Sequence, residues 1–405
     1  METSLDLPLN PVVRELGARL LADLDRLSDR LVERIHRHEP LYADQQPVDV
    51  DDLRRSVRIN LERSMQALSG QIPAGGDWSD RAIATGHQRA RQGMPLESVL
   101  RAYRLGGTII WEGMVEEARR DPENFDADRL LDAASPIWQL IDGHSTMMSE
   151  AYRVEESRLR SRDLRRRQAL LEALVEGCGA DPAFAQQAAR TLGIPATGRL
   201  LCVVAITDVS GNEPLRAPHD ALGPLGIESV WLTRTTTEVG LVDLATASSE
   251  KVIAALRARA EGRVGVAPVI QGLDEVSRAY RLAELAARTL PEEAADVAAL
   301  DERLPEALVA NGPEVAPQLL AATVTPLLDL PATERDTLVA TLAAVLDHDG
   351  SPSRAAEVLY CHRNTVTYRL RRIEELTGRG VSSPRDKLLW TLGLAALEQG
   401  AIPPS

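Results

Sequence analysis

A run of hydrogen-bond donors follows a short turn near the carboxyl end of the chain. Arg363, Asn364, Thr367 and Arg371 recur at spacings that place them on one face of a helix, with Tyr368 near its edge. Arginine can donate two hydrogen bonds to guanine, and asparagine can bind adenine at two points. Threonine, tyrosine and backbone amides suit phosphate oxygens. These residue types therefore predict contacts with duplex DNA.

The opposite face of the same helix is apolar. Val366, Leu370 and Ile373 recur at i, i+4 and i+7. We expect this stripe to pack on a preceding short helix through its small and apolar residues, Ala355, Ala356 and Leu359. Two helices separated by a tight turn, the second with a polar leading end, are typical of a helix-turn-helix.

Capping residues predict where these two helices begin. Ser351 and Pro352 form a sound start for the first helix, with the serine as N-cap and the proline in the first turn. For the second helix the position of the turn makes His362 the expected cap.

Positive charge is concentrated at this pair of helices. The whole chain carries a formal charge of −14, which opposes long-range attraction to DNA. The helix pair sets five arginines against Glu357 alone: Arg354, Arg363, Arg369, Arg371 and Arg372. A solvated arginine-rich helix is the alternative, and the companion helix and turn argue against it.

The carboxyl end resembles a known family. The runs HRNTVTYRLRRIEELTG (362–378) and SPRDKLLWTLGLAAL (383–397) are similar to the DNA-binding domain of PucR/CdaR-type transcriptional regulators. The resemblance implies a Fis-like helix-turn-helix whose second helix enters the major groove. It also implies a preceding helix with Leu338, Leu342 and Leu346, and a last helix that closes the core with Leu388, Leu389, Leu392 and Leu397. With the arginines of the pair, it nominates these DNA-binding residues: Arg354, His362, Arg363, Asn364, Thr365, Thr367, Tyr368, Arg369, Arg371 and Arg372.

Length and composition predict a multidomain, mainly α-helical protein. The chain has 405 residues, enough for about two to four domains, and only 3% aromatic residues, so its cores are aliphatic. We find no stretch of about 18 apolar residues and no signal peptide. Three isolated cysteines form neither a disulfide framework nor a metal pair. These features predict a cytoplasmic protein that spans no membrane.

The amino-terminal region, 12–152, is predicted to be a helical sensor domain. Leucines from Leu16 to Leu31 at spacings of three and four mark the first helix. The region, mainly through 93–111, resembles the N-terminal domain of RsbR-type stress-signalling proteins, which implies an all-α globin-like fold that usually lacks haem. A haem or metal site is disfavoured also because alternate residues of a helix, such as His36 and His38, point in different directions and do not both bind one ion. The histidines considered were His36, His38, His87 and His144.

A charged helix in 153–190 is predicted to connect the sensor to the next domain. Val154, Leu164, Leu171 and Val175 lie loosely at heptad spacing. The stripe is either a dimer seam or part of a solvated helix laid against one neighbouring domain.

The central region, 198–290, is predicted to be an α/β domain. Expected strands are 199–207, 229–234, 238–244 and 262–269, with helices at 249–261 and 273–289. Its order resembles the degenerate GGDEF-like domain of PucR/CdaR regulators. An active diguanylate cyclase needs a Gly-Gly turn and an Asp-Glu pair, and the run Thr235-Thr236-Thr237-Glu238 with Asp208 supplies neither.

The remaining segments complete the predicted organisation. Proline-interrupted linker helices are expected at 291–335 and the DNA-binding domain at 336–400. We find no other catalytic signature, so no enzyme, cofactor or metal is predicted. The expected function is a DNA-binding transcriptional regulator that acts as a homodimer and responds to a signal or small-molecule effector of unknown identity. The alternative is a signalling scaffold that binds a partner protein through its RsbR-like domain.

Overall fold

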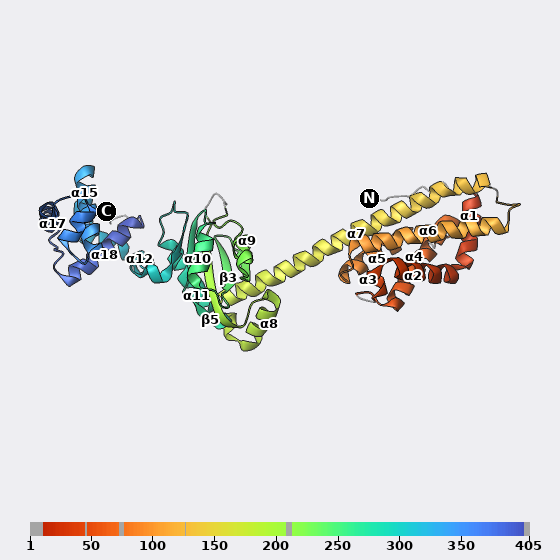
Figure 1. Cartoon of the computed structure of the whole chain (residues 1–405), viewed down its shortest axis with the longest axis horizontal. Helices are drawn as coiled ribbons and strands as arrows, with labels where there is room; N and C mark the ends of the chain where they lie inside the picture. Colours follow the sequence, from red (N-terminus) through yellow and green to blue (C-terminus); the bar gives the residue numbers. More distant parts are fainter. Residues whose placement is uncertain (1–10, 45–46, 73–76, 126, 208–212, 401–405) are drawn as a thin grey trace. The chain divides into compact units, whose positions relative to one another are not determined.

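The computed structural model describes residues 11–44, 47–72, 77–125, 127–207 and 213–400 (Figure 1). These residues are mainly helical, with a six-stranded sheet in the central region, which confirms the predicted fold class. The chain divides into two compact units, Met1–Arg165 and Arg166–Ser405. Within the described ranges, no helix is long and apolar enough to cross a membrane.

The N-terminal unit is a bundle of helices, and α1 and α2 pack against α4 and α6. Its helices are α1 (Pro11–Ala22), α2 (Leu24–His38), α3 (Pro40–Ala43), α4 (Val50–Ser69), α5 (Asp80–Arg91), α6 (Leu96–Arg120) and the first part of α7 (Ala127–Val175).

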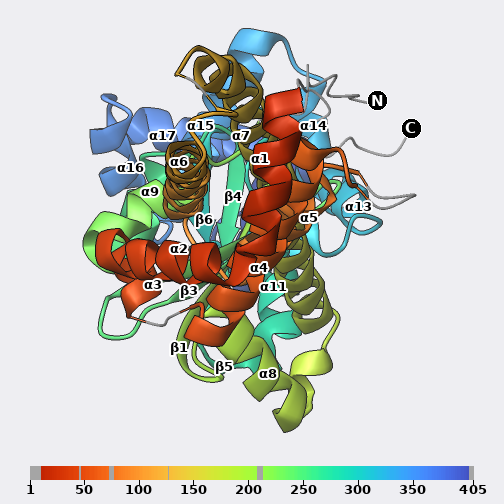
Figure 2. The same cartoon turned by 90° about the vertical axis from the view of Figure 1, so that its right-hand side faces the viewer.

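The leucine repeat expected to mark one helix belongs to two. Asp23 leaves the helical region, with φ −109° and ψ 24°, and the chain restarts as α2 at Leu24. Figure 2 shows α1 and α2 running in different directions. Both helices keep their leucines buried, so the apolar stripe continues across the break.

Glycines allow α7 to approach its neighbours in this unit. A Cβ added at Gly86 of α5 would lie 2.3 Å from the carbonyl oxygen of Met148, and one at Gly107 of α6 would lie 2.4 Å from Cδ1 of Ile141. The first contact is with backbone, so Gly86 requires glycine, whereas a side chain at Gly107 would require Ile141 to move.

The central sheet has the strand order β2-β3-β1-β4-β6, with β5 also paired to β1. β1 is antiparallel to β3, β4 and β5, whereas β4 and β6 are parallel. The four expected strands are present, and β5 and β6 were not predicted. The bounds are β1 (Thr197–Ile206), β2 (Ser229–Thr233), β3 (Thr237–Asp243), β4 (Arg263–Val266), β5 (Ile270–Gly272) and β6 (Asp296–Ala299).

Helices cover both faces of this sheet. Alternate residues of β1 point to opposite sides, so Leu200 and Cys202 join one core and Leu201 and Val203 the other. α8 (Pro182–Leu192), α11 (Val276–Arg288) and the end of α7 pack on the first face. α9 (Pro218–Leu222) and α10 (Ser249–Arg257) pack on the second.

The two ends of the expected heptad stripe on α7 differ in burial. Leu171 and Val175 are buried in the core on the first face of the sheet. Val154 and Leu164 are 62% and 58% exposed. The stripe is therefore not one continuous seam, since its last two residues already have intramolecular partners.

The segment after the sheet consists of short helices with a proline in the first turn, whereas the sequence analysis expected proline-interrupted helices over 291–335, of which 296–299 form β6. Pro305, Pro317 and Pro326 lie in the first turns of α12 (Leu304–Ala310), α13 (Ala316–Ala322) and α14 (Thr325–Leu328). Four further helices follow: α15 (Ala332–Asp347), α16 (Pro352–Val358), α17 (Arg363–Thr377) and α18 (Pro384–Glu398).

Candidate nucleic-acid interface

The two helices of the predicted motif begin at the predicted caps. Ser351 Oγ accepts a hydrogen bond from the backbone N–H of Arg354 at 3.4 Å. His362 Nδ1 accepts one from the backbone N–H of Asn364 at 3.2 Å. Because Nδ1 is the acceptor, Nε2 carries the proton of the neutral ring and is a donor at the start of α17.

The apolar stripe of α17 serves two small cores. Val366 is buried with Ala355 and Ala356 of α16, as predicted, and with Val345 of α15. Ile373 instead joins a second core that contains Trp390, Leu342 and Leu338. α17 is therefore held along its whole length, which fixes the direction of its polar face.

The turn between α16 and α17 contains a strained residue. Tyr360 has φ +51° and is 97% exposed. A non-glycine residue in this left-handed region costs about 1–2 kcal/mol, and no burial of the ring compensates for it. The turn is closed by a hydrogen bond of 3.0 Å from the N–H of Cys361 to the carbonyl oxygen of Ala356.

Five of the predicted DNA-binding residues lie together on the outward face of α17. Arg363, Asn364 and Arg371 are exposed, and Tyr368 is 71% exposed. Thr367 is half-buried and donates its hydroxyl to the carbonyl oxygen of Arg363 at 3.0 Å. We call this set the outward face: Arg363, Asn364, Thr367, Tyr368 and Arg371.

Two other predicted arginines point toward α15. Arg369 donates from Nη1 to the hydroxyl of Thr341 at 3.2 Å. Arg372 donates from Nε to Glu334 at 3.3 Å. Helical spacing placed these two arginines beside the apolar stripe, although they were still predicted to bind DNA, and in the structure both have partners on α15. Thr365, also predicted, is half-buried.

Arg354 of α16 is exposed beside a carboxylate. Its Nη1 lies 3.4 Å from Asp349, and the two side chains are 63% and 91% exposed. Such surface pairs contribute about 0–1 kcal/mol, so this one leaves the arginine largely available to a ligand.

The charge of this region differs from that of the rest of the chain. Residues 332–400 contain nine arginines and lysines and nine aspartates and glutamates. The formal charge of −14 therefore resides elsewhere in the protein. The acidic remainder would repel DNA at long range, whereas the helix pair itself presents cations.

The last helix closes the core differently from the prediction. Leu388 is 60% exposed, so its predicted burial is wrong, while Leu392 and Leu397 pack against the core. Trp390, which the sequence analysis did not single out, is fully buried at the centre. The signal in the sequence that could have predicted this burial is a single large aromatic residue in a leucine-rich helix.

The positions compared with a diguanylate cyclase offer little to a metal ion. Burial, together with the charge of Glu213, raises the pKa of Glu238 to about 7, so this carboxyl is only partly ionised at neutral pH. Asp208 lies outside the described residues. No group of three potential metal-ligating side chains occurs in the part of the chain that the structure describes.

The four histidines considered for haem lie in separate environments. His144 is buried, and its ring stacks on Trp78 with centroids 5.2 Å apart. His87 lies 3.5 Å from Glu155. His38 Nδ1 lies 2.9 Å from the carbonyl oxygen of Arg34, and His36 Nε2 is buried without a hydrogen-bond partner.

Comparison with protein families assigns each region to a domain type. Residues 25–167 match the RsbT co-antagonist protein RsbRD N-terminal domain, residues 176–289 the GGDEF-like domain, and residues 338–396 the PucR C-terminal helix-turn-helix domain. The chain has the domain composition of a PucR/CdaR-type regulator. This confirms the resemblance seen in the sequence.

Individual relatives match over short segments. The carbohydrate diacid regulator of Escherichia coli is 42% identical over 59 residues, which is 15% of each chain. An uncharacterized protein of Mycobacterium tuberculosis is 50% identical over 50 residues, 12% of each chain. The chain thus spans only 12% to 15% of the length of these first relatives. A regulator of polyketide synthase expression from Bifidobacterium adolescentis aligns in structure over 57% of this chain and 96% of its own, with 23% identity and a TM-score of 0.30.

Proposed function

We propose that this PucR/CdaR-type regulator binds operator DNA through the outward face of α17 and thereby regulates transcription. The observation that carries the proposal is the exposed leading end of α17, where Arg363 and Asn364 project beside the helix N-terminus. Side chains of these types can read guanine and adenine in the major groove, while the helix N-terminus suits phosphate. The PucR-type match over 338–396 supports the same reading.

Within this proposal the ten predicted residues have two roles. The outward face, with His362 and Arg354, contacts bases or phosphates. Arg369 and Arg372 hold α17 against α15 through Thr341 and Glu334. Thr365 stays a proposed phosphate or base partner because it follows the leading residues directly.

A homodimer on DNA is part of the proposal, since one recognition helix reads only a few base pairs. Val154 and Leu164, the exposed members of the heptad stripe on α7, are apolar residues that a second copy would cover. Leu164→Glu should weaken self-association in sedimentation velocity, whereas Leu171→Glu would unfold the central core and is not a usable test. An unchanged sedimentation profile for Leu164→Glu would remove α7 as the seam.

In this proposal the protein is not an enzyme, and it acts in the cytoplasm, where the bacterial chromosome lies. Its N-terminal unit receives the signal, and the GGDEF-like domain relays it. The raised pKa of Glu238 and the threonine run before it argue against cyclase chemistry.

The test begins by selecting bound fragments from the native genome with the full-length protein. Affinity for a selected duplex is then measured by fluorescence anisotropy at several salt concentrations. Arg371→Ala should reduce the salt slope by about 0.9 if the side chain neutralises one phosphate. The matched control is Arg278→Ala, an exposed arginine on α11. If the folded protein shows no salt-sensitive affinity for any duplex, DNA binding is wrong and the partner-protein scaffold becomes the better hypothesis.

A further inference from the structure

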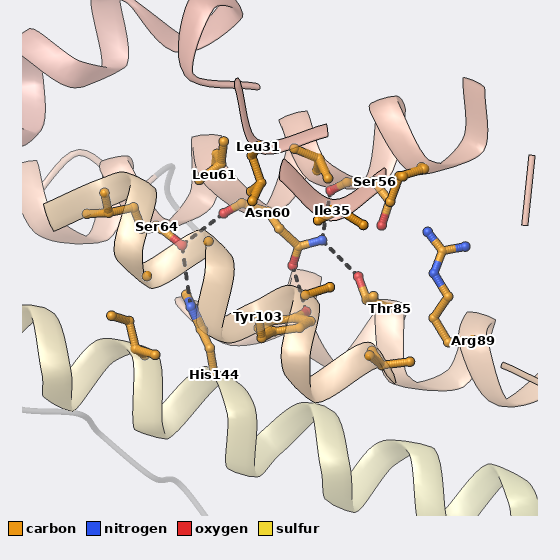
Figure 3. Close-up of a pocket in the computed structure, with 18 of the residues that line it drawn as sticks. Leu31, Ile35, Ser56, Asn60, Leu61, Ser64, Thr85, Arg89, Tyr103 and His144 are labelled. Carbon is orange, nitrogen blue, oxygen red and sulfur yellow. Dashed lines mark hydrogen bonds between the residues drawn. The ribbon is translucent and has the colours of Figure 1, made fainter. Parts of the chain in front are cut away.

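The N-terminal unit contains a cavity that its side chains leave unfilled. The cavity has a volume of about 70 Å³ and is lined by residues of α2, α3, α4, α5, α6 and α7 (Figure 3). Its walls are mainly aliphatic: Leu31, Ile35, Leu61, Val99, Ile110 and Ile141.

Gly106 of α6 leaves part of this space unfilled. A Cβ added there would meet only Leu31 Cδ2, at an ordinary distance of 3.5 Å. By contrast, Gly107 next to it and Gly113 in the same helix have neighbours at 2.4 and 3.0 Å. Glycine inside a helix costs about 1 kcal/mol relative to alanine. Gly106 therefore lowers stability without a packing requirement and enlarges the cavity.

Most polar groups around the cavity already have partners. Asn60 donates to the carbonyl oxygen of Ser56 and to Thr85 Oγ1, both at 2.9 Å, and accepts from the Tyr103 hydroxyl at 2.9 Å. The charge of Arg89 is balanced by Asp52, 2.6 Å from its Nη1. These bonds fix the wall and leave no unpaired cation in it to hold an anionic ligand.

His144 is different, because one of its nitrogens has only a long hydrogen bond to a shared hydroxyl group. Its Nε2 lies 2.7 Å from the carbonyl oxygen of Trp78 and must therefore carry the proton. Nδ1 is then an acceptor, and it faces Ser64 Oγ at 3.4 Å. Ser64 has one hydroxyl hydrogen for two acceptors, this nitrogen and the carbonyl oxygen of Asn60, which is closer at 2.9 Å, so the bond to His144 is the weaker one. The His144 ring is 6% exposed, so solvent satisfies this acceptor poorly.

We propose that the cavity binds a small neutral molecule with an aliphatic body and one hydroxyl group, which donates to His144 Nδ1. A cavity of about 150 Å³ takes up benzene, so about 70 Å³ suits a body of roughly three or four heavy atoms, far smaller than a haem. A carboxylate or ammonium would lose its hydration among aliphatic walls without a compensating partner. Burial also lowers the pKa of His144, which keeps the ring neutral and Nδ1 able to accept.

This proposal names the class of ligand that the N-terminal unit would sense. It rests on the proposed function only in treating that ligand as a signal for transcription. The binding measurements contain no DNA. A protein that binds the probe but no duplex would refute the regulator and leave the cavity site intact, and the reverse result would do the opposite.

The experiment uses the full-length chain and four probes: xenon, 1-propanol, propionate and propylammonium. Xenon NMR reports whether the cavity accepts an apolar atom, and ligand-observed NMR titration gives the affinity of each organic probe. We expect saturable 1-propanol binding that displaces xenon and is at least tenfold tighter than that of either charged analogue. Equal affinity for a charged analogue, or no saturable binding of 1-propanol, would overturn the proposal.

Variants of two residues separate the cavity from the hydrogen bond. Gly106→Ala should reduce the affinity for 1-propanol and xenon, and Gly106→Val should abolish binding of both, with helicity unchanged by circular dichroism. His144→Phe should lower 1-propanol affinity about tenfold with xenon binding retained, while His144→Gln, which keeps an acceptor, should restore part of it. Undiminished 1-propanol binding by folded Gly106→Ala, or by a folded His144→Phe that retains xenon binding, would refute the site.

Discussion

The outward face of α17 and the wall of the N-terminal cavity use polar side chains in opposite ways. On α17, Arg363, Asn364 and Arg371 are exposed at the surface. In the cavity wall, Arg89 is buried and Asn60 and Tyr103 are half-buried, and all three form hydrogen bonds with other side chains of the same unit. The first arrangement is suited to a large charged partner, and the second to a small uncharged one. A substitution should therefore change DNA binding in the first region, and stability or the binding of a small molecule in the second.

The largest expected effect is on the cavity wall. Arg89 is 1% exposed and pairs with Asp52, so Arg89→Met leaves a carboxylate without its cation and should destabilise the N-terminal unit by about 3–5 kcal/mol. Scanning calorimetry of the full chain should show an earlier transition. The double variant Arg89→Met/Asp52→Leu should recover much of the loss. A single variant as stable as the parent would show that the pair is not buried in solution.

Arg363→Ala should have the next largest effect, and only on DNA. If Arg363 donates two hydrogen bonds to guanine, the change should cost about 1–3 kcal/mol of binding free energy for a selected operator. It should also reduce the preference for guanine at that base pair. Competition anisotropy with single-base variants of the operator measures both quantities. Arg278→Ala should behave like the parent, and an identical result for Arg363→Ala would remove this residue from the interface.

A pH effect should distinguish the two regions further. Burial lowers the pKa of His144, opposed by the Trp78 carbonyl and by Asp80 and Asp77, with Arg63 lowering it further. The unfolded chain protonates this ring near pH 6.5, before the folded protein does, so the stability of the N-terminal unit should fall as the pH drops through about 6.5. Melting temperatures from pH 8 to pH 5 would show this. His144→Gln should flatten the profile in that window, and an equally steep profile would assign the effect to another group.

The smallest expected effect concerns the turn before α17. Tyr360→Gly removes the strain of φ +51° and should stabilise the C-terminal helices by about 0.5–1 kcal/mol, because glycine adopts this conformation freely but loses more entropy on folding. Tyr360→Ala, which keeps a Cβ, is the matched control and should give no such gain. Denaturant unfolding of the full chain compares them, and equal stability of the two variants would argue against strain at this turn.

The same contrast explains what the sequence could predict. The DNA-binding motif is contained in 351–378, so its caps, its apolar stripe and its polar face are all visible locally. Helical spacing placed Arg369 and Arg372 beside the apolar stripe but did not reveal their partners, because Thr341 and Glu334 belong to another helix. The cavity has no signature in the sequence, since six helices contribute to it.

Short strands escaped prediction for a related reason. β5 and β6 have three and four residues, too few for an alternating pattern to stand out. β6 joins the sheet by parallel pairing with β4 after the intervening α11, so its partner is distant in the chain. Likewise, the leucine spacing continues through Asp23 and conceals the break between α1 and α2.

The links from Arg369 and Arg372 to α15 have a consequence for how operator preference could change. In the proposed function, these two residues support α17 from outside the outward face. Exchanging side chains such as Arg363 or Asn364 would then alter which sequence is recognised while the scaffold stays in place. If α17 reads operator DNA as proposed, residues that choose the sequence and residues that hold the helix in place are different, and the preferred operator can change while the fold is kept.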